Sequence, residues 1–382
     1  MKIKFQLKSG CKYILFALII TIVLFTCLEG LCSFTFSFLR IQRSKIVAER
    51  IHTEYDPLLG WINKPDLYIK DMYGPDKYFQ TNSQRFRNNS NFDTDIPEGK
   101  RRWICCGDSF TLGYGVDNDN TWSALLSSLV PDIETVNMGQ GGYGIDQAYL
   151  WFMRDGIKLQ YDLLIFAFIS ADLTRAISSK YRDYPKPLLS VKEGIIIKNN
   201  IPVPHPGFIA QHLPKIESAI RSLRVTTLAH ALLNILRRSD RAPNTKRYET
   251  VTRVKKLTSA IFNSLYDYNK QNQRTILFIY LPTQMDYRNN IRTRIARSFL
   301  SSQAEQNRWL FIDLIDDFRS LAPEDVSELF IQRDLPGYKE SKGHYTEEGN
   351  RYIAELIMKK IASNQATRGL LNPKLQASKP KQ

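Results

Sequence analysis

Residues 103–110 read Trp-Ile-Cys-Cys-Gly-Asp-Ser-Phe, a short apolar run followed at once by a glycine, an acid and a serine. The apolar run predicts a buried strand that ends near Gly107. Ser109 then stands where the strand gives way to a helix. In open parallel α/β sheets, ligands bind at the carboxyl ends of the strands, so a hydroxyl at this corner is placed to attack a bound group. This position makes Ser109 a candidate nucleophile.

A histidine near the end of the globular region is the candidate base. His344 lies in the segment 343–350, just before a predicted helix start. The other histidines are His52, His205, His212 and His230. Only His344 follows the last predicted strand. We therefore expect His344 to take the proton of Ser109 and return it to a leaving alcohol, as in serine hydrolases.

Five apolar runs predict the strands of one α/β domain: residues 103–106, 133–137, 163–169, 275–281 and 309–314. The segments between them are long enough for crossover helices, which predicts a parallel sheet. The connection between the third and fourth runs is far longer than one crossover helix needs. We expect an insertion there, at about residues 174–270, that either caps the active site or packs on the sheet as an elaborated crossover. Within it, residues 188–203 predict two short strands, and residues 213–238 and 246–269 predict helices.

These motifs together resemble the SGNH (GDSL-type) hydrolase family, and more narrowly its bacterial membrane-anchored members, over about residues 55–363. The resemblance rests on Gly107-Asp108-Ser109, on the glycine-rich segment 137–144 and on the histidine segment 343–350, in the family's order. Residues 56–61 and 81–87 look like the lead-in segments of the anchored members. The resemblance implies a flavodoxin-like three-layer α/β sandwich with a five-stranded parallel sheet. It also implies an oxyanion hole made by the backbone N–H groups of Ser109 and Gly142.

Two positions depart from the family's pattern. Ala171 stands where the family presents an asparagine that donates to the oxyanion, and Ala171 has no donor in its side chain. Ser341 stands where an aspartate usually orients the histidine. Glu340 is the first candidate for the missing acid and Asp334, in the same loop, is the substitute. A serine–histidine dyad without an acid is the remaining alternative.

Residues 13–39 are almost wholly apolar, and Glu29 is the one charged residue among them. This length predicts a transmembrane helix. A cleaved signal peptide would need a small-residue cleavage site, which is not evident. Basic residues flank both ends: Lys2, Lys4, Lys8 and Lys12 on one side, and Arg40, Arg43, Lys45 and Arg50 on the other. Charge therefore does not decide the orientation, and it is the resemblance that implies a domain outside the cytoplasm.

The predicted organisation is a basic segment (1–12), a membrane anchor (13–39), a linker and lead-in segment (40–100), the hydrolase domain (101–363) and a polar, disordered tail (364–382). The net charge of +15 favours anionic surfaces. The basic residues are scattered and no nucleic-acid motif is present, so we expect anionic lipid headgroups or acidic glycans rather than nucleic acid. Cys105 and Cys106 should point to opposite faces of their strand. No cluster has metal-ligand spacing, and serine chemistry needs no metal or organic cofactor.

The predicted activity is the hydrolysis or transfer of an O-acyl group, expected to be acetyl, on a carbohydrate of the cell envelope. The carbohydrate is implied by the resemblance and the envelope location together. A lipid or small-ester hydrolase is the second enzymatic interpretation. Ala171 and Ser341 favour a different class, a catalytically impaired domain that binds an envelope glycan or a membrane partner.

Overall fold

The structure is a computed structural model that describes residues 9–43, 49–182, 184–205, 243–288, 291–333, 335, 338 and 340–371. Residues 47–206 and 243–382 form one compact unit, and residues 1–46 and 207–242 belong to another. Both sequence motifs that define the candidate site, around Ser109 and His344, lie in the first of these units.

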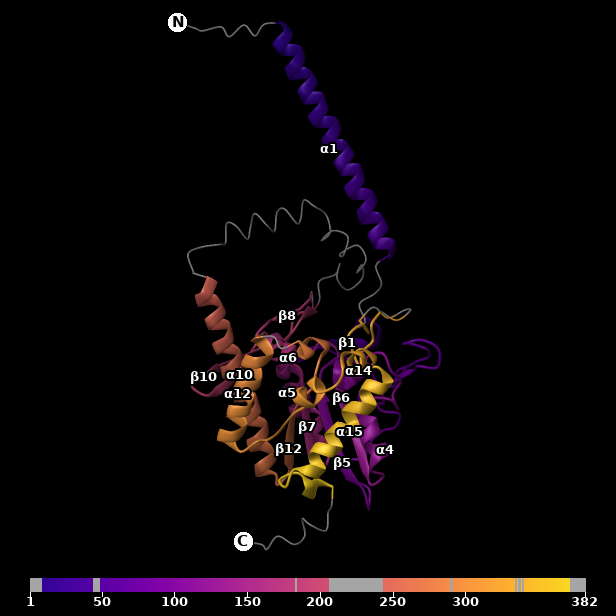
Figure 1. Ribbon diagram of the computed structural model, residues 1–382, viewed down its shortest axis with the longest axis vertical. Coiled ribbons are helices and arrows are strands. Elements are labelled where there is room, and N and C mark those ends of the chain that lie inside the picture. The colour runs from indigo at the N-terminus through magenta and orange to yellow at the C-terminus, as the bar shows by residue number, and fades with distance from the viewer. Residues whose placement is uncertain are drawn as a thin grey trace. The chain divides into compact units, whose positions relative to one another are not determined.

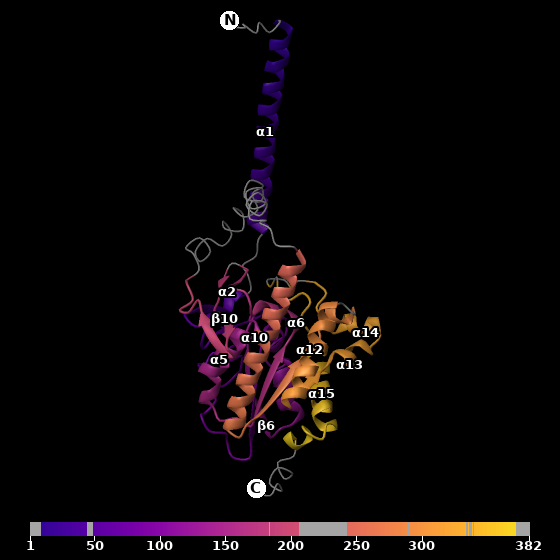
Figure 2. The ribbon, with the colours of Figure 1, turned by 90° about the vertical axis from the view of Figure 1, so that its left-hand side faces the viewer.

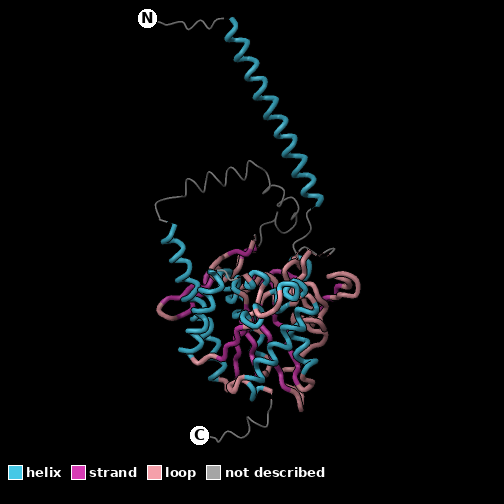
Figure 3. The backbone as a smooth tube through the Cα atoms, in the orientation of Figure 1, coloured by secondary structure: helices cyan, strands magenta, loops and turns pink. Residues whose placement is uncertain are grey.

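A five-stranded parallel sheet forms the centre of this unit (Figures 1 and 3). Its strands are β5 (Arg101–Gly107), β6 (Ile133–Gly139), β7 (Leu163–Phe168), β12 (Thr275–Tyr280) and β13 (Leu310–Asp313). They lie in the order β13-β12-β7-β5-β6. This is the flavodoxin-like order, in which the first strand lies between the second and the third. The predicted fold class is confirmed, and each of the five apolar runs forms a strand.

Helices cover both faces of the sheet and complete three layers (Figure 2). One face is covered by α5 (Ile145–Arg154), α10 (Pro243–Gln271) and α12 (Ile291–Asn307), the other by α4 (Trp122–Leu129) and α15 (Glu347–Ser363). We call the core beneath α5, α10 and α12 the first core and the core beneath α4 and α15 the second core. Cys106 packs into the first core and Cys105 into the second, as predicted for neighbours on a strand. Because both faces are buried, the strands read as nearly continuous apolar runs.

Short elements connect these layers. They are α3 (Ser109–Leu112), η1 (Gly156–Lys158), α6 (Ser170–Arg175), α11 (Gln284–Tyr287), α13 (Ile315–Arg319), α14 (Pro323–Glu328) and η2 (Arg368–Leu370). α3 directly follows β5, and α6 directly follows β7. Since β5 and β7 are parallel neighbours, both helices begin at the same carboxyl edge of the sheet. This edge holds the candidate site.

The lead-in segment consists of small elements packed on the domain. They are α2 (Glu49–His52), β1 (Thr53–Asp56), β2 (Gly60–Asn63), β3 (Tyr68–Ile69) and β4 (Phe79–Gln80). β1 and β2 pair as an antiparallel hairpin, which we call the lead-in hairpin (residues 53–63). All four residues of β2 are buried.

The insertion after α6 begins with four short strands: β8 (Lys180–Tyr181), β9 (Tyr184–Pro185), β10 (Leu188–Lys192) and β11 (Ile195–Asn199). β10 and β11 form a hairpin, which confirms the two short strands predicted in residues 188–203. α10 confirms the helix predicted at residues 246–269. The helix predicted at residues 213–238 lies outside the described residues.

The two ends of the chain differ in character. α1 (Ser9–Arg43) contains a stretch, Lys12–Thr35, with a mean hydropathy of 2.5, long and apolar enough to cross a membrane. At the other end, Leu370 is buried in the second core, and Arg101 donates a hydrogen bond to its carbonyl oxygen. The prediction of a disordered tail from residue 364 is therefore wrong for residues 364–371, because this apolar side chain anchors them. Residues 372–382 lie outside the described part.

Candidate active site

Ser109 is the first residue of α3, immediately beyond the carboxyl end of β5. Asp108 caps this helix, because its carboxylate accepts a hydrogen bond from the N–H of Phe110 at 2.9 Å. A Cβ on Gly107 would collide with Thr111, so the tight corner between strand and helix requires glycine. The hydroxyl of Ser109 is thereby held at the edge of the sheet by two local features that the sequence motif itself contains.

His344 meets Ser109 from the opposite end of the chain. Its Nε2 lies 2.7 Å from the Ser109 Oγ. The histidine loop is held by backbone hydrogen bonds to Ile331, which donates to the His344 carbonyl and accepts from Gly343, both at 2.8 Å. The imidazole packs against the rings of Phe110 and Tyr114, with centroid distances of 4.7 and 5.1 Å. Its position is therefore fixed by packing as well as by the hydrogen bond.

The imidazole of His344 is kept neutral by its surroundings. Burial lowers its pKa from 6.5 to about 4, although the carboxylate of Asp108 and the carbonyl of Ser341 act in the opposite direction. Nδ1 has no partner at hydrogen-bond geometry within the described residues. A neutral imidazole at pH 7 can accept the proton of Ser109 through Nε2. Among the residues described, no carboxylate orients Nδ1, and the acceptor that acts on the imidazole is the backbone carbonyl of Ser341.

The acid expected beside His344 needs a correction. Both carboxylate oxygens of Glu340 face the guanidinium of Arg182, in the turn between β8 and β9, and not the imidazole. Ser341 uses its hydroxyl within the loop, accepting from the N–H of Leu335 and donating to the carbonyl of Tyr338. Glu340 is diverted because a planar guanidinium binds a carboxylate through two parallel hydrogen bonds. Asp334, the substitute, lies outside the described residues.

Two backbone N–H groups at this edge are free to bind an oxygen. Neither the Ser109 nor the Gly142 amide donates a backbone hydrogen bond within the described part of the chain. Ser109 owes this to its place in the first turn of a helix, whose amides have no intrahelical acceptor. Gly142 has a φ of +74°, and a Cβ there would overlap the ring of Tyr181. The geometry thus leaves these two predicted donors available.

Ala171 lies at the start of α6, at the same edge of the sheet. It is half-buried and packs against the second core. Its neighbour Asp172 closes the turn, because the carboxylate accepts a hydrogen bond from the N–H of Ile169 at 3.0 Å. At position 171 the first turn of α6 therefore presents a methyl group and no side-chain donor.

A buried charge network underlies the nucleophile. One nitrogen of the Arg175 guanidinium lies 3.2 Å from Asp108, 2.6 Å from Asp172 and 3.0 Å from the carbonyl of Tyr143. Burial and the neighbouring carboxylate of Asp108 raise the pKa of Asp172 well above its usual value. Arg175 thus contacts the carboxylates of both Asp108 and Asp172. The network holds the carboxylate that caps α3.

A second buried pair fastens the insertion to this network. Lys186 and Asp146 form an ion pair whose side chains are fully buried. Lys186 also donates to the carbonyl of Arg175 at 3.0 Å. Burial lowers the pKa of Lys186 and raises that of Asp146, while the ion pair opposes both shifts. Sequence reasoning missed Arg175, Lys186 and Asp146, and the only local signal was the i,i+3 spacing of Asp172 and Arg175 on one helix face.

The remaining candidates contribute nothing to this geometry. His52 is buried against Phe79, and His205 stacks on Tyr55 at 3.6 Å. His212 and His230 lie outside the described residues. No group of three or more potential metal ligands occurs within the described ranges.

Comparisons with known proteins give structural neighbours alone. No protein-family profile and no curated protein matches the sequence. A member of the lipolytic protein G-D-S-L family from Veillonella parvula is 13% identical, with 69% of this chain and 100% of that chain covered and a TM-score of 0.38. The acetyl xylan esterase AlAXEase is 15% identical, with 68% and 99% covered and a TM-score of 0.38. A lipase/acylhydrolase from Enterococcus faecalis is 13% identical, with 68% and 95% covered and a TM-score of 0.34. At these values the function has to be inferred from the residues of this chain.

Proposed function

We propose that this chain is a serine ester hydrolase of the SGNH type, with Ser109 as nucleophile and His344 as general base. The observation that carries the proposal is the 2.7 Å contact between the Ser109 Oγ and the His344 Nε2 at the carboxyl edge of the sheet. A nucleophile within hydrogen-bond reach of a neutral base is the arrangement that activates a serine. The two unpaired amides beside it supply the other requirement, a place for negative charge.

The proposed reaction proceeds through an acyl-enzyme. The Ser109 Oγ attacks the ester carbonyl while His344 takes the hydroxyl proton. The amides of Ser109 and Gly142 donate to the oxygen that becomes negatively charged. His344 then returns the proton to the leaving alcohol, and a water molecule, activated by the same base, releases the acid. Transfer of the acyl group to another alcohol would follow the same steps with that alcohol in place of water.

We propose an O-acylated carbohydrate of the cell envelope as the substrate, with acetyl as the acyl group. The apolar stretch Lys12–Thr35 supports a membrane anchor. The extracytoplasmic side of the enzymatic domain is proposed from the family resemblance alone. A lipid or small-ester substrate is the alternative, and an acyl-chain length series distinguishes the two.

A fluorophosphonate probe tests the proposal directly. Purified wild-type protein should be labelled at Ser109 and should hydrolyse a short acyl ester, whereas Ser109→Ala should do neither. His344→Ala should also abolish turnover, and the double variant should be hardly worse than either single variant, because the two residues act as one unit. Circular dichroism checks that each variant is folded.

The unpartnered Nδ1 of His344 and the methyl group of Ala171 favour one competing function, a binding domain without catalysis. Such a domain would stay unlabelled by the probe while still retaining an envelope glycan on an affinity column. Wild-type turnover that survives in both single variants would refute the assignment of the nucleophile and the base.

A further inference from the structure

One side chain of the lead-in hairpin, that of Trp61, contacts the loop that contains Gly142. The indole N–H of Trp61, on β2, donates a hydrogen bond of 2.9 Å to the carbonyl oxygen of Gly141. Both groups are buried, and Trp61 is only 2% exposed. Gly141 lies in the loop between β6 and α5, directly before Gly142.

The acceptor of this bond belongs to the peptide unit that contains the proposed oxyanion donor. The carbonyl of Gly141 and the N–H of Gly142 are the two polar ends of one planar peptide. In a trans peptide these ends point in opposite directions. A donor that holds the carbonyl on one side therefore aims the N–H toward the other side. A hydrogen bond to the carbonyl also polarises the N–H and makes it a stronger donor.

We propose that Trp61 is a positioning residue for the oxyanion hole, acting through the Gly141–Gly142 peptide. The inference rests on the function proposed above and deepens it. It assigns a role in the reaction to a residue of the lead-in hairpin, which precedes the first strand of the sheet. The lead-in hairpin is then part of the catalytic apparatus and not only a connection to the membrane helix.

The indole is fixed well enough for this role. Its ring packs among those of Tyr143, Tyr181 and Tyr184, with centroid distances of 5.6, 5.9 and 5.8 Å. The hydroxyl of Tyr143 donates to the carbonyl of Trp61, at 2.5 Å. The chain is thus tied to Trp61 on both sides of Gly142, at Gly141 and at Tyr143. Orientation matters more here than elsewhere in the loop, because Gly142 has left-handed backbone geometry and no side chain to fix it.

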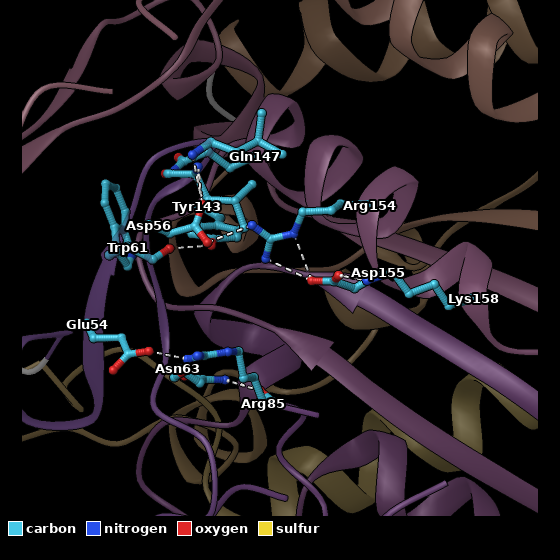
Figure 4. A network of polar contacts seen from close by, with 12 residues as sticks. Glu54, Asp56, Trp61, Asn63, Arg85, Tyr143, Gln147, Arg154, Asp155 and Lys158 are labelled. Atoms are coloured by element: carbon cyan, nitrogen blue, oxygen red, sulfur yellow. Dashed lines mark hydrogen bonds and ion pairs between the residues drawn. The ribbon is translucent and has the colours of Figure 1, made fainter. Parts of the chain in front are cut away.

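Further contacts keep the hairpin itself in place (Figure 4). The carboxylate of Asp56 accepts hydrogen bonds from the N–H groups of Leu58 and Leu59 and pairs with Arg154 at 2.6 Å. The side-chain amide of Gln147, on α5, donates to the carbonyl of Leu59 at 2.7 Å. This last bond provides a matched control. Like the bond from Trp61, it gives a buried backbone carbonyl its donor, but it does not touch the Gly142 peptide.

The experiment compares Trp61→Phe with Gln147→Met in the full-length protein. Each variant removes one donor to a buried carbonyl of the same region. For Trp61→Phe, kcat for a short acyl ester should fall by about 10- to 100-fold with KM unchanged, because the oxyanion forms only after binding and a misdirected donor loses part of its effect. Gln147→Met should lower the melting temperature to a similar degree and leave kcat unchanged.

The outcomes separate the two proposals. Equal losses of kcat in both variants, or an unchanged kcat in Trp61→Phe, would overturn the positioning role while leaving the esterase assignment intact. A wild-type protein without turnover or probe labelling refutes the proposed function and the role of Trp61 with it. If Trp61→Phe does not fold, replacement of Trp61 by β-(3-benzothienyl)alanine keeps the shape of the ring without its N–H. The same loss of kcat at constant KM is then expected.

Discussion

The lowered pKa of His344 predicts how the activity should change with pH. Burial lowers the pKa of this imidazole from 6.5 to about 4, which corresponds to about 3 kcal/mol in favour of the neutral form. The neutral form is the active one, since it must accept the proton of Ser109. At pH 5 about 90% of the imidazole is neutral with the lowered pKa, against about 3% with the ordinary one. Activity should therefore persist to unusually low pH.

The assay is kcat/KM for a short acyl ester between pH 4 and pH 8, because this ratio reports the ionisation of the free enzyme. Between pH 7 and pH 5 it should fall by only about a tenth, whereas an ordinary histidine would produce a fall of about 25-fold. Since the unfolded state binds the proton more readily, stability decreases as the pH falls from about 6.5 towards 4, so circular dichroism must accompany each point. An acid limb with an apparent pKa between 6 and 7 in folded protein would refute the proposed burial of a neutral base.

Three substitutions extend the test to other parts of the site. Glu340→Gln should change kcat by less than about threefold and the free energy of unfolding by at most about 1 kcal/mol, because Glu340 pairs with Arg182 at the surface. A loss of kcat of tenfold or more would show that the carboxylate does orient His344. Lys186→Met should lower the free energy of unfolding in a denaturant titration by about 3–5 kcal/mol, because it leaves the fully buried carboxyl of Asp146 without its partner. An equally stable variant would contradict the ion pair. Ala171→Asn should restore a donor and raise kcat, by as much as about tenfold, and an unchanged kcat in a folded variant would mean that this position does not limit the rate.

The fold could be predicted because its signals are local. A strand buried on both faces reads as an apolar run, whatever it packs against, and the five runs recur as β5, β6, β7, β12 and β13. The prediction of a disordered tail from residue 364 is wrong because the order of this segment depends on a tertiary contact. Whether residues 364–371 are ordered depends on Leu370 packing into a core formed by residues distant in the sequence, which the local sequence does not reveal.

In the candidate site, too, the features set by consecutive residues could be predicted, and the contacts between distant residues could not. The corner at Gly107-Asp108-Ser109 carries its own geometry, so its place at the sheet edge follows from a few consecutive residues. The partner of Glu340 does not, because Arg182 lies 158 residues away and only tertiary structure brings the two together. The bond from Trp61 to Gly141 spans 80 residues. The local sequence around each of these residues does not indicate which distant residue it will contact.

The aromatic packing around His344 orients the imidazole but does not stabilise a positive charge on it. The rings of Phe110 and Tyr114 hold the imidazole in place, which is one task that a carboxylate performs in a serine–histidine–acid triad. Packing cannot perform the other task, the stabilisation of the imidazolium that forms when Ser109 attacks. Burial opposes that charge most strongly and Arg175 opposes it as well, whereas the carboxylate of Asp108 and the carbonyl of Ser341 favour it. The neutral imidazole is therefore favoured before the reaction, and the imidazolium is disfavoured in the transition state. Catalysis then depends on stabilising the other charge that develops, the oxyanion, through the amides of Ser109 and Gly142.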